Sequence, residues 1–182
     1  MSAKDIRNIV LLGHSGSGKT TLAESMLYLT GGTDRLGRIA DGNTVCDYDP
    51  EEIRRQISIS LAVAPVEYDS CKINVLDVPG GFDFAGEVAE AVQAADAAVI
   101  VCSAKAGMSV GAEKAWKYCE KNSLPRLLYI SKTDEENSDY DQLLLRHHRA
   151  LRVRGVRGVP DPAVPAVLAP RVRGGGAHRR LQ

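Results

Sequence analysis

The sequence predicts an α/β fold, with a mainly parallel sheet covered by helices on both faces. Short apolar runs of strand length alternate with helical patterns up to residue 130. Three polar motifs each follow an apolar run, and parallel sheets of this kind bind their ligands at the carboxyl ends of the strands. The first motif, Gly-His-Ser-Gly-Ser-Gly-Lys-Thr, has the spacing GxxxxGKT. Together these observations predict the fold of a P-loop NTPase.

The first strand is expected at residues 9–12, and the first helix at residues 20–29. In the loop between them, backbone N–H groups and the start of the helix favour bound phosphate, and Lys19 adds a positive charge. The sequence therefore predicts a nucleoside phosphate here. The residues expected to contact it are Gly13, His14, Ser15, Gly16, Ser17, Gly18, Lys19, Thr20 and Thr21.

The elements that follow are expected in a fixed order. Strands at 57–66 and 72–76 are joined by a hairpin turn at 67–70. A helix at 84–94, a buried strand at 97–102, a helix at 110–121 and a buried strand at 126–130 come next. The polar segment 31–52 has no apolar periodicity, which predicts a functional or mobile loop. A nucleotide-sensing switch is the sharper hypothesis for it, and plain surface disorder is the alternative.

Two further motifs point to the chemistry of the ligand. Asp77, at the end of a predicted strand, can hold a water of a Mg²⁺ shell, and the N–H of Gly80 can approach a γ-phosphate closely. The segment Ser131-Lys132-Thr133-Asp134 resembles the guanine-reading motif NKxD, in which the Asp134 position accepts two hydrogen bonds that adenine cannot donate. Guanine is therefore favoured over adenine. The alternative is an exposed turn before an acidic run.

Composition narrows the class of protein. The net charge is zero, but residues 146–182 contain nine arginines and one acidic residue, so the remainder is acidic. Four widely spaced cysteines favour buried free thiols in a reducing cytosol over zinc or a disulfide framework. No apolar run is long enough for a signal peptide or a membrane span, so a cytoplasmic protein without a membrane partner is expected.

The three motifs and the segment 49–59 resemble the amino-terminal GTP-binding domain of elongation factor G, and within that family its divergent elongation-factor-G-like members. The resemblance covers about residues 6–145. It implies GTP or GDP with Mg²⁺ as the ligands. It also implies that Lys19 contacts the β- and γ-phosphates, that Thr20 and Ser58 ligate Mg²⁺, and that Asp77 holds the ion through water. The γ-phosphate would order the long loop, and hydrolysis would release it.

Three positions depart from the family pattern. Gly81 stands where the family has the histidine that positions the attacking water, which predicts slow hydrolysis unless a partner supplies the missing group. Gly16 replaces a loop aspartate, which removes one candidate ligand for a monovalent cation. Ser131 replaces an asparagine, which predicts weaker contacts to the base and the loop. A non-catalytic nucleotide-binding switch or remnant is the alternative function, and a P-loop ATPase or kinase is a third.

The composition changes after Tyr140. No Ile, Phe, Tyr, Asn, Lys, Thr or Ser occurs in 141–182, a pattern that a shifted reading frame in a GC-rich gene produces. We therefore expect a partial GTP-binding domain at 1–145 and a disordered Arg/Pro/Gly-rich tail at 146–182. An evolved arm that binds RNA non-specifically is the rival. If the frame is shifted, the domain is incomplete at its C-terminal end and the strand at 126–130 has an uncovered edge. The ribosome, the family's partner, is then doubtful for this chain.

Overall fold

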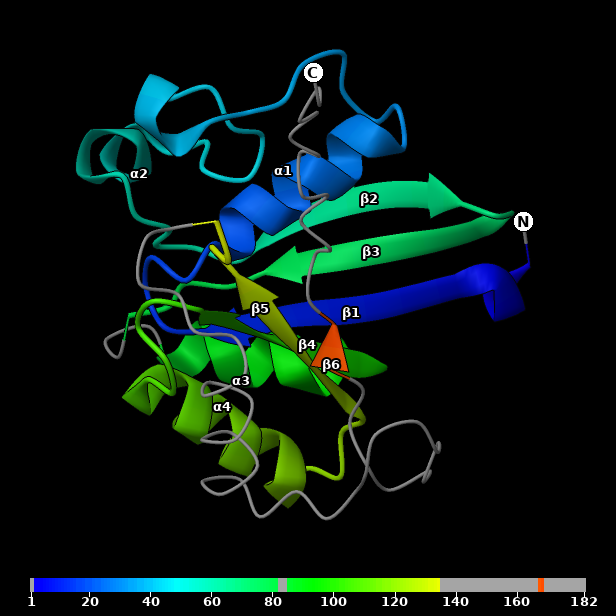
Figure 1. Cartoon of the computed structure of the whole chain (residues 1–182). Helices are drawn as coiled ribbons and strands as arrows, with labels where there is room; N and C mark the ends of the chain where they lie inside the picture. The colour runs from blue at the N-terminus through cyan, green and yellow to red at the C-terminus, as the bar shows by residue number, and fades with distance from the viewer. Residues whose placement is uncertain (1, 82–84, 135–166, 169–182) are drawn as a thin grey trace, which may run out of the picture.

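A six-stranded sheet forms the centre of the molecule (Figure 1). The computed structural model describes residues 2–81, 85–134 and 167–168. The spatial order is β2-β3-β1-β4-β5-β6, and neighbouring strands run parallel except for the antiparallel pair β2 and β3. The predicted mainly parallel α/β sheet is therefore confirmed. The strands are β1 (Ile6–Gly13), β2 (Ala62–Tyr68), β3 (Cys71–Asp77), β4 (Ala97–Ser103), β5 (Arg126–Ser131) and β6 (Val167–Leu168).

Helices cover both faces of this sheet, as predicted. Figure 1 shows α1 (Lys19–Leu29) and α2 (Pro50–Arg55) on one side, and α3 (Ala85–Ala94) and α4 (Val110–Lys121) on the other. Two short 3₁₀ helices, η1 (Ala3–Asp5) and η2 (Ile39–Asp41), complete the described elements. Residue 84, with which the helix expected at 84–94 was to begin, lies outside the described residues. The carboxyl ends of β1 and β3 meet at one edge of the molecule, where the phosphate loop follows β1.

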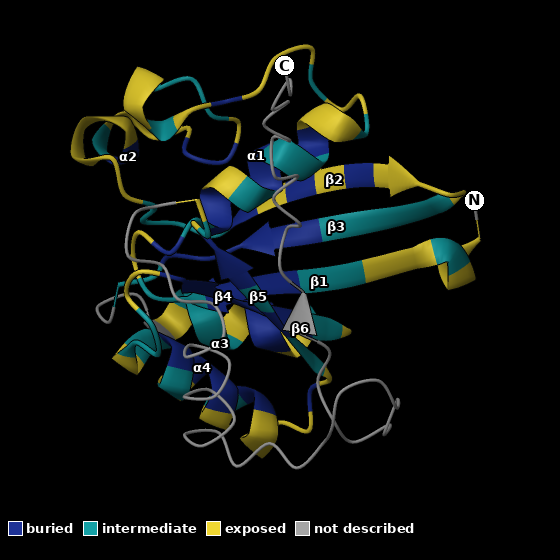
Figure 2. Cartoon of the chain, viewed as in Figure 1, coloured by how far each residue is buried: buried dark blue, intermediate teal, exposed yellow. Residues whose placement is uncertain are grey.

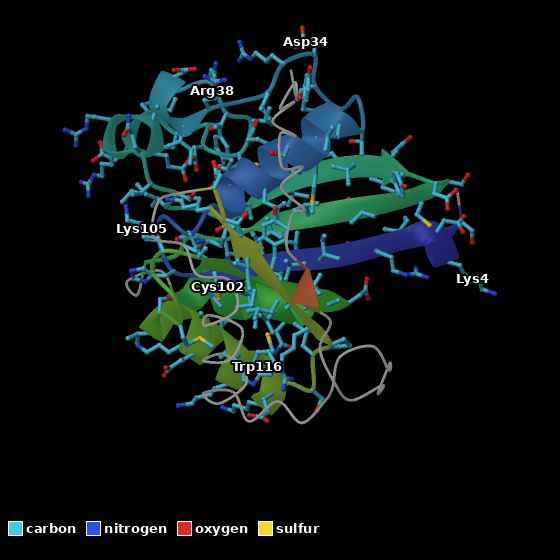
Figure 3. All side chains as sticks on the ribbon, viewed as in Figure 1. Lys4, Asp34, Arg38, Cys102, Lys105 and Trp116 are labelled. Carbon is cyan, nitrogen blue, oxygen red and sulfur yellow. The ribbon has the colours of Figure 1, made fainter. Side chains whose placement is uncertain are left out.

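The sheet divides the apolar core into two clusters. On β1, Leu11 packs with residues of α1, whereas Val10 and Leu12 pack with residues of α3 and α4. This alternation follows from the two-residue period of a strand. Buried residues accordingly occupy the middle of the sheet and the inner sides of the helices (Figure 2). Trp116, which Figure 3 labels, lies on α4 and is buried, and the Arg126 guanidinium lies 4.3 Å from the centre of its ring.

The antiparallel hairpin begins later than predicted. The strand expected at 57–66 starts only at Ala62, because side chains take the backbone N–H groups before it. Glu52 accepts hydrogen bonds from Ile59 and Ser60, and Glu87 accepts one from the next residue. The hairpin predicted at 67–70 is present with a tighter turn, in which the two residues 69 and 70 both have positive φ, 49° and 63°.

The polar segment 31–52 contains more structure than the sequence predicted. It includes η2, and α2 begins in it at Pro50. Asp49 caps α2 by accepting from the N–H of Glu51, and Glu52 accepts from the N–H of Asp49 in return. A proline at the first helical position needs no N–H partner, which favours a helix start here. The predicted loop therefore contains one 3₁₀ helix and the start of α2, and its role as a nucleotide-sensing switch stays a prediction.

The predicted uncovered edge of β5 is paired over a short length. Val167 and Leu168 form β6, whose register places them beside Leu128 and Tyr129 of β5. These are the only described residues of the 146–182 segment, so the disorder and frameshift predictions for that segment lie outside the described residues.

The four cysteines are free thiols. Cys46, Cys102 and Cys119 are buried, and Cys71, at the start of β3, is only half-buried, contrary to the expectation of burial. Burial raises the pKa of Cys102 to about 12 and that of Cys119 to about 11. Within the described residues, no helix combines the length and apolarity that crossing a membrane requires.

Candidate functional site

The loop after β1 folds back on its own lysine. The Lys19 ammonium donates to the carbonyl oxygens of Gly13 and His14, at 3.4 and 3.1 Å, and the lysine is only 6% exposed. Gly18 precedes α1 with φ of 95°, a conformation that favours glycine. A Cβ at Gly13 would lie 2.4 Å from the carbonyl oxygen of Val101, so only glycine fits against β4. The predicted strand, loop and helix are therefore present with a buried lysine at their centre.

Four oxygen-bearing side chains meet at the start of α1. The Thr20 hydroxyl donates to Asp77 Oδ2 at 2.7 Å, and the Ser58 hydroxyl donates to Asp47 Oδ1 at 2.7 Å. The two hydroxyl oxygens lie 3.2 Å apart. Each hydroxyl has given its single proton to a carboxylate, so its remaining lone pairs are acceptors. The second oxygen of Asp77, Oδ1, is buried and has no hydrogen-bond partner among the described residues. This cluster presents several hard oxygen atoms, the donor type that Mg²⁺ prefers.

Burial controls the charges of this cluster. Desolvation raises the pKa of Asp77 from 3.8 to about 6, although the hydrogen bond from Thr20 and the charge of Lys19 oppose the shift. Desolvation also raises the pKa of Asp47, against the hydrogen bond from Ser58. The pKa of Lys19 is lowered by burial, and the two aspartates act against that change. Two buried acids beside one buried lysine leave an excess of negative charge, which a cation would neutralise.

Gly80 lies directly against the phosphate loop. A Cβ at this position would lie 2.5 Å from the backbone N of Ser15 and 2.6 Å from Lys19 Nζ. Gly81 follows it and brings no side chain to the site. Residues 15, 16, 18–20, 39, 47, 56–58 and 80 line a cavity of about 60 Å³ above the loop. Five of the nine predicted phosphate-binding residues are thus brought together with Ser58 and Gly80 around one small space, whereas residues 13, 14, 17 and 21 do not line it.

The motif after β5 contacts the phosphate loop from the other side. The Ser131 hydroxyl donates to the carbonyl oxygen of Ser17 at 2.7 Å and lies 3.2 Å from that of Cys102, so serine keeps a contact to the loop in the asparagine position. Lys132 has a φ of 56° and lines a second cavity with His14 and its loop neighbours. Lys105 lines the same cavity, at the edge of the molecule that carries the loop (Figure 3). Asp134 and Thr21 are exposed.

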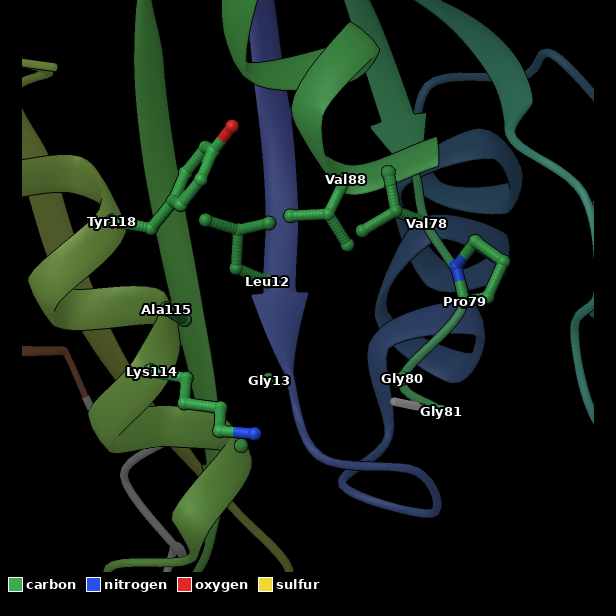
Figure 4. A pocket seen from close by; sticks show the side chains of 11 residues that line it. Leu12, Gly13, Val78, Pro79, Gly80, Gly81, Val88, Lys114, Ala115 and Tyr118 are labelled. Atoms are coloured by element: carbon green, nitrogen blue, oxygen red, sulfur yellow. The ribbon is translucent and has the colours of Figure 1, made fainter. Parts of the chain in front are cut away.

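A separate apolar cavity of about 190 Å³ lies next to Gly80 and Gly81 (Figure 4). Leu12, Val88 and Tyr118 form its walls from β1, α3 and α4, and Lys114 stands near the end of β1. Its lining is mainly apolar side chains and glycine backbone, whereas the carboxylates and hydroxyls described above gather at the phosphate loop.

Sequence reasoning missed three buried acids at the site. Asp47 accepts a hydrogen bond from the Ser58 hydroxyl, and Glu24 on α1 accepts from two backbone N–H groups of the polar segment. Glu52 accepts from three backbone N–H groups. Glu24 and Glu52 are each 1% exposed. The pattern Asp-Pro-x-Glu at residues 49–52 was the one local signal, since it is a capping box. Nothing local distinguishes Glu24 or Asp47 from exposed acids.

Comparisons with known proteins agree with this geometry. The model of the elongation factor Tu GTP binding domain matches residues 4–169. An elongation factor G-like protein of Mycobacterium tuberculosis is 42% identical over 139 residues, which are 76% of this chain and 20% of that protein. Mitochondrial ribosome-releasing factor 2 of Anopheles gambiae is 40% identical over 144 residues, 79% of this chain and 20% of the relative.

A solved structure agrees as well. A crystal structure of a protein from Thermus thermophilus superposes with a TM-score of 0.78 and 43% identity, and the match covers 80% of this chain and 22% of the other. The chain spans about a fifth of the length of the curated relatives it matches, 20% in both cases above.

Proposed function

Because the chain belongs to the family of the elongation factor Tu GTP-binding domain and corresponds to that domain of elongation-factor-G-like translation factors, we propose that it binds GTP and GDP together with Mg²⁺. It hydrolyses GTP slowly or only with a partner. The observation that carries the proposal is the oxygen cluster of Thr20, Ser58 and Asp77 beside the buried Lys19.

The residues fit a magnesium ion. Thr20 and Ser58 turn lone pairs toward each other, and Asp77 Oδ1 is an orphaned buried acceptor that a cation or its water would satisfy. In this proposal Thr20 and Ser58 hold the ion and Asp77 holds it through water. Bound there, the ion would neutralise charge on the β- and γ-phosphates. Lys19 Nζ would exchange its two carbonyl contacts for phosphate oxygens.

Guanine selection is assigned to Asp134, with Ser131 and Lys132 supporting the phosphate loop. A carboxylate at position 134 would accept from the N1–H and the 2-amino group of guanine, and adenine would leave it unsatisfied. The test is displacement of a fluorescent GTP analogue by GTP and by ATP. GTP should displace the analogue at a much lower concentration, and equal displacement by ATP would refute the assignment in favour of an ATPase or kinase.

Gly81 sets the expectation for hydrolysis. It lies beside Gly80 at the phosphate loop and has no side chain with which to orient a water. A water-positioning group contributes about 10²- to 10⁴-fold to a rate. We expect Gly81→His to raise single-turnover GTP hydrolysis, and an unchanged rate would remove the support for this explanation. Gly81 also favours a second candidate, a nucleotide switch without catalysis, which multiple-turnover phosphate release above background would exclude.

We propose the role of a longer protein of this type from one of its relatives. The Anopheles relative is described as a ribosome-releasing factor, so a ribosomal partner is our proposal for a full-length protein of this type. A cytoplasmic location is proposed from the sequence alone. Non-specific RNA binding by the arginine-rich 146–182 segment is proposed from its charge. Co-sedimentation of the chain with ribosomes, with and without non-hydrolysable GTP, tests the ribosomal partner. The salt dependence of binding to an unrelated RNA tests the RNA binding.

A further inference from the structure

Glu24 is a buried carboxylate that does not belong to the proposed metal cluster. It lies on α1 four residues after Thr20, so the two side chains lie on the same face of the helix. It is 1% exposed. An ionised or hydrogen-bonding group buried to this extent is costly unless it is well satisfied. Its partners therefore define what it does.

The partners of Glu24 are all in the polar segment that follows α1. Oε1 accepts the backbone N–H groups of Val45, at 2.7 Å, and of Cys46, at 3.0 Å. Oε2 is buried against Gly37, where a Cβ would lie only 2.2 Å from it. Oε2 has no hydrogen-bond partner among the described residues. The segment thus encloses the carboxylate from two sides, at position 37 and at positions 45–46.

The contact continues from Glu24 into the metal cluster. Cys46, which Glu24 holds, is followed directly by Asp47, whose carboxylate accepts from the Ser58 hydroxyl at 2.7 Å. The Ser58 oxygen lies 3.2 Å from that of Thr20, back on α1. The chain therefore forms a closed ring that leaves α1 at Glu24 and returns to it at Thr20.

From this ring we propose that Glu24 is a positioning residue, which fixes Asp47 and Ser58 above Thr20 and so makes tight nucleotide binding dependent on Mg²⁺. The inference rests on the proposed function, because it assigns the ring a role in metal-dependent nucleotide binding. Glu24 acts through the backbone of residues 45 and 46 and contacts neither the nucleotide nor the metal.

Three variants of the full chain separate geometry from charge. Glu24→Ala removes the acceptor of both N–H groups. Glu24→Gln keeps an acceptor oxygen and removes the charge, so it is the matched control. Gly37→Ala keeps the carboxylate but pushes it away, because the new Cβ would overlap Oε2. Should Glu24→Ala fail to fold, Gly37→Ala provides the same measurement.

The measurement is the dissociation rate of a fluorescent, non-hydrolysable GTP analogue, in Mg²⁺ and in EDTA, because the γ-phosphate is the group expected to hold the polar segment in place. Glu24→Ala should accelerate dissociation in Mg²⁺ by about tenfold, equivalent to about 1.4 kcal/mol, with little change in EDTA. Glu24→Gln should stay close to the wild type, Gly37→Ala should resemble Glu24→Ala, and the double variant should be no faster than Glu24→Ala. Equal acceleration in both conditions, or a Gln variant as fast as the Ala variant, would overturn the proposal.

A second readout does not require nucleotide. Hydrogen exchange of the Val45 and Cys46 amides should be slow in the wild type and in Glu24→Gln, and fast in Glu24→Ala. Unchanged protection in Glu24→Ala would overturn the contact itself. A wild type that binds no guanine nucleotide would refute the proposed function, whereas the amide protection would still report on the ring.

Discussion

Neutralising Asp77 should stabilise the nucleotide-free domain while weakening its metal site. Burial raises the pKa of Asp77 from 3.8 to about 6. A shift of one pKa unit corresponds to about 1.4 kcal/mol, so about two units make the ionised form cost about 3 kcal/mol in the fold. Asp77→Asn removes this cost and keeps a carbonyl oxygen that can accept from Thr20.

The direction of the Asp77 pKa shift determines the pH range in which the substitution changes stability. Because the folded-state pKa is the higher one, the native state binds more protons between about pH 4 and pH 6, and the unfolding free energy contributed by Asp77 falls as pH rises through that range. The variant should therefore be about as stable as the wild type near pH 4. It should become more stable by up to about 3 kcal/mol above pH 7.

Urea unfolding in EDTA measures this difference. The fluorescence of Trp116, the one tryptophan in the chain and a buried residue, reports the transition. Taking the difference between variant and wild type at each pH cancels the titration of other groups. Thr20→Val removes the hydrogen bond that lowers the Asp77 pKa, so the pH-dependent loss of stability should become larger and extend to higher pH. A difference that is constant from pH 4.5 to 7.5, or a less stable variant at pH 7.5, would refute the reasoning.

Three further substitutions test the packing around the phosphate loop. Gly80→Ala should lower GTP affinity about tenfold or more, because the Cβ would lie 2.6 Å from Lys19 Nζ; a titration with wild-type affinity would contradict this. Glu52→Ala should lower the free energy of unfolding by about 1–3 kcal/mol, because three backbone N–H groups lose their acceptor. Urea unfolding measures that loss, and an unchanged midpoint would count against it. Ser131→Ala should weaken GDP binding about fivefold, since the loop loses about 1 kcal/mol of contact to the Ser17 carbonyl; equal affinities in a GDP competition assay would show that the contact does not support the loop.

The parts of the fold that were predictable are those with local signals. The strand, loop and helix around Lys19 combine apolar periodicity with fixed glycine spacing, and their predicted order is confirmed. Asp77 was expected at the end of a strand because it follows an apolar run, and it is the last residue of β3, opposite Leu11 of β1. In both cases the physical cause acts within a few residues of the chain.

The acids that organise the site were not predictable in this way. Glu24 accepts hydrogen bonds from Val45 and Cys46, which lie more than twenty positions further along the chain. Its burial depends on a segment without apolar periodicity. Residues 57–61 have the alternation of a strand, but the Glu52 carboxylate takes the N–H groups of Ile59 and Ser60, so β2 starts later. Tertiary hydrogen bonds decided both outcomes, and a local pattern carries no information on them.

The unequal burial of the thiols makes this domain convenient for spectroscopy. Cys46, Cys102 and Cys119 are buried, and burial raises their pKa values, so their reactive thiolate forms are suppressed. A maleimide dye should therefore attach first to the half-buried Cys71. Cys71 and Asp77 are the two ends of β3, about 20 Å apart at the usual rise of a strand. A dye at that end, paired by energy transfer with a fluorescent nucleotide at the phosphate loop, would report nucleotide binding without touching the site, and it needs no engineered cysteine.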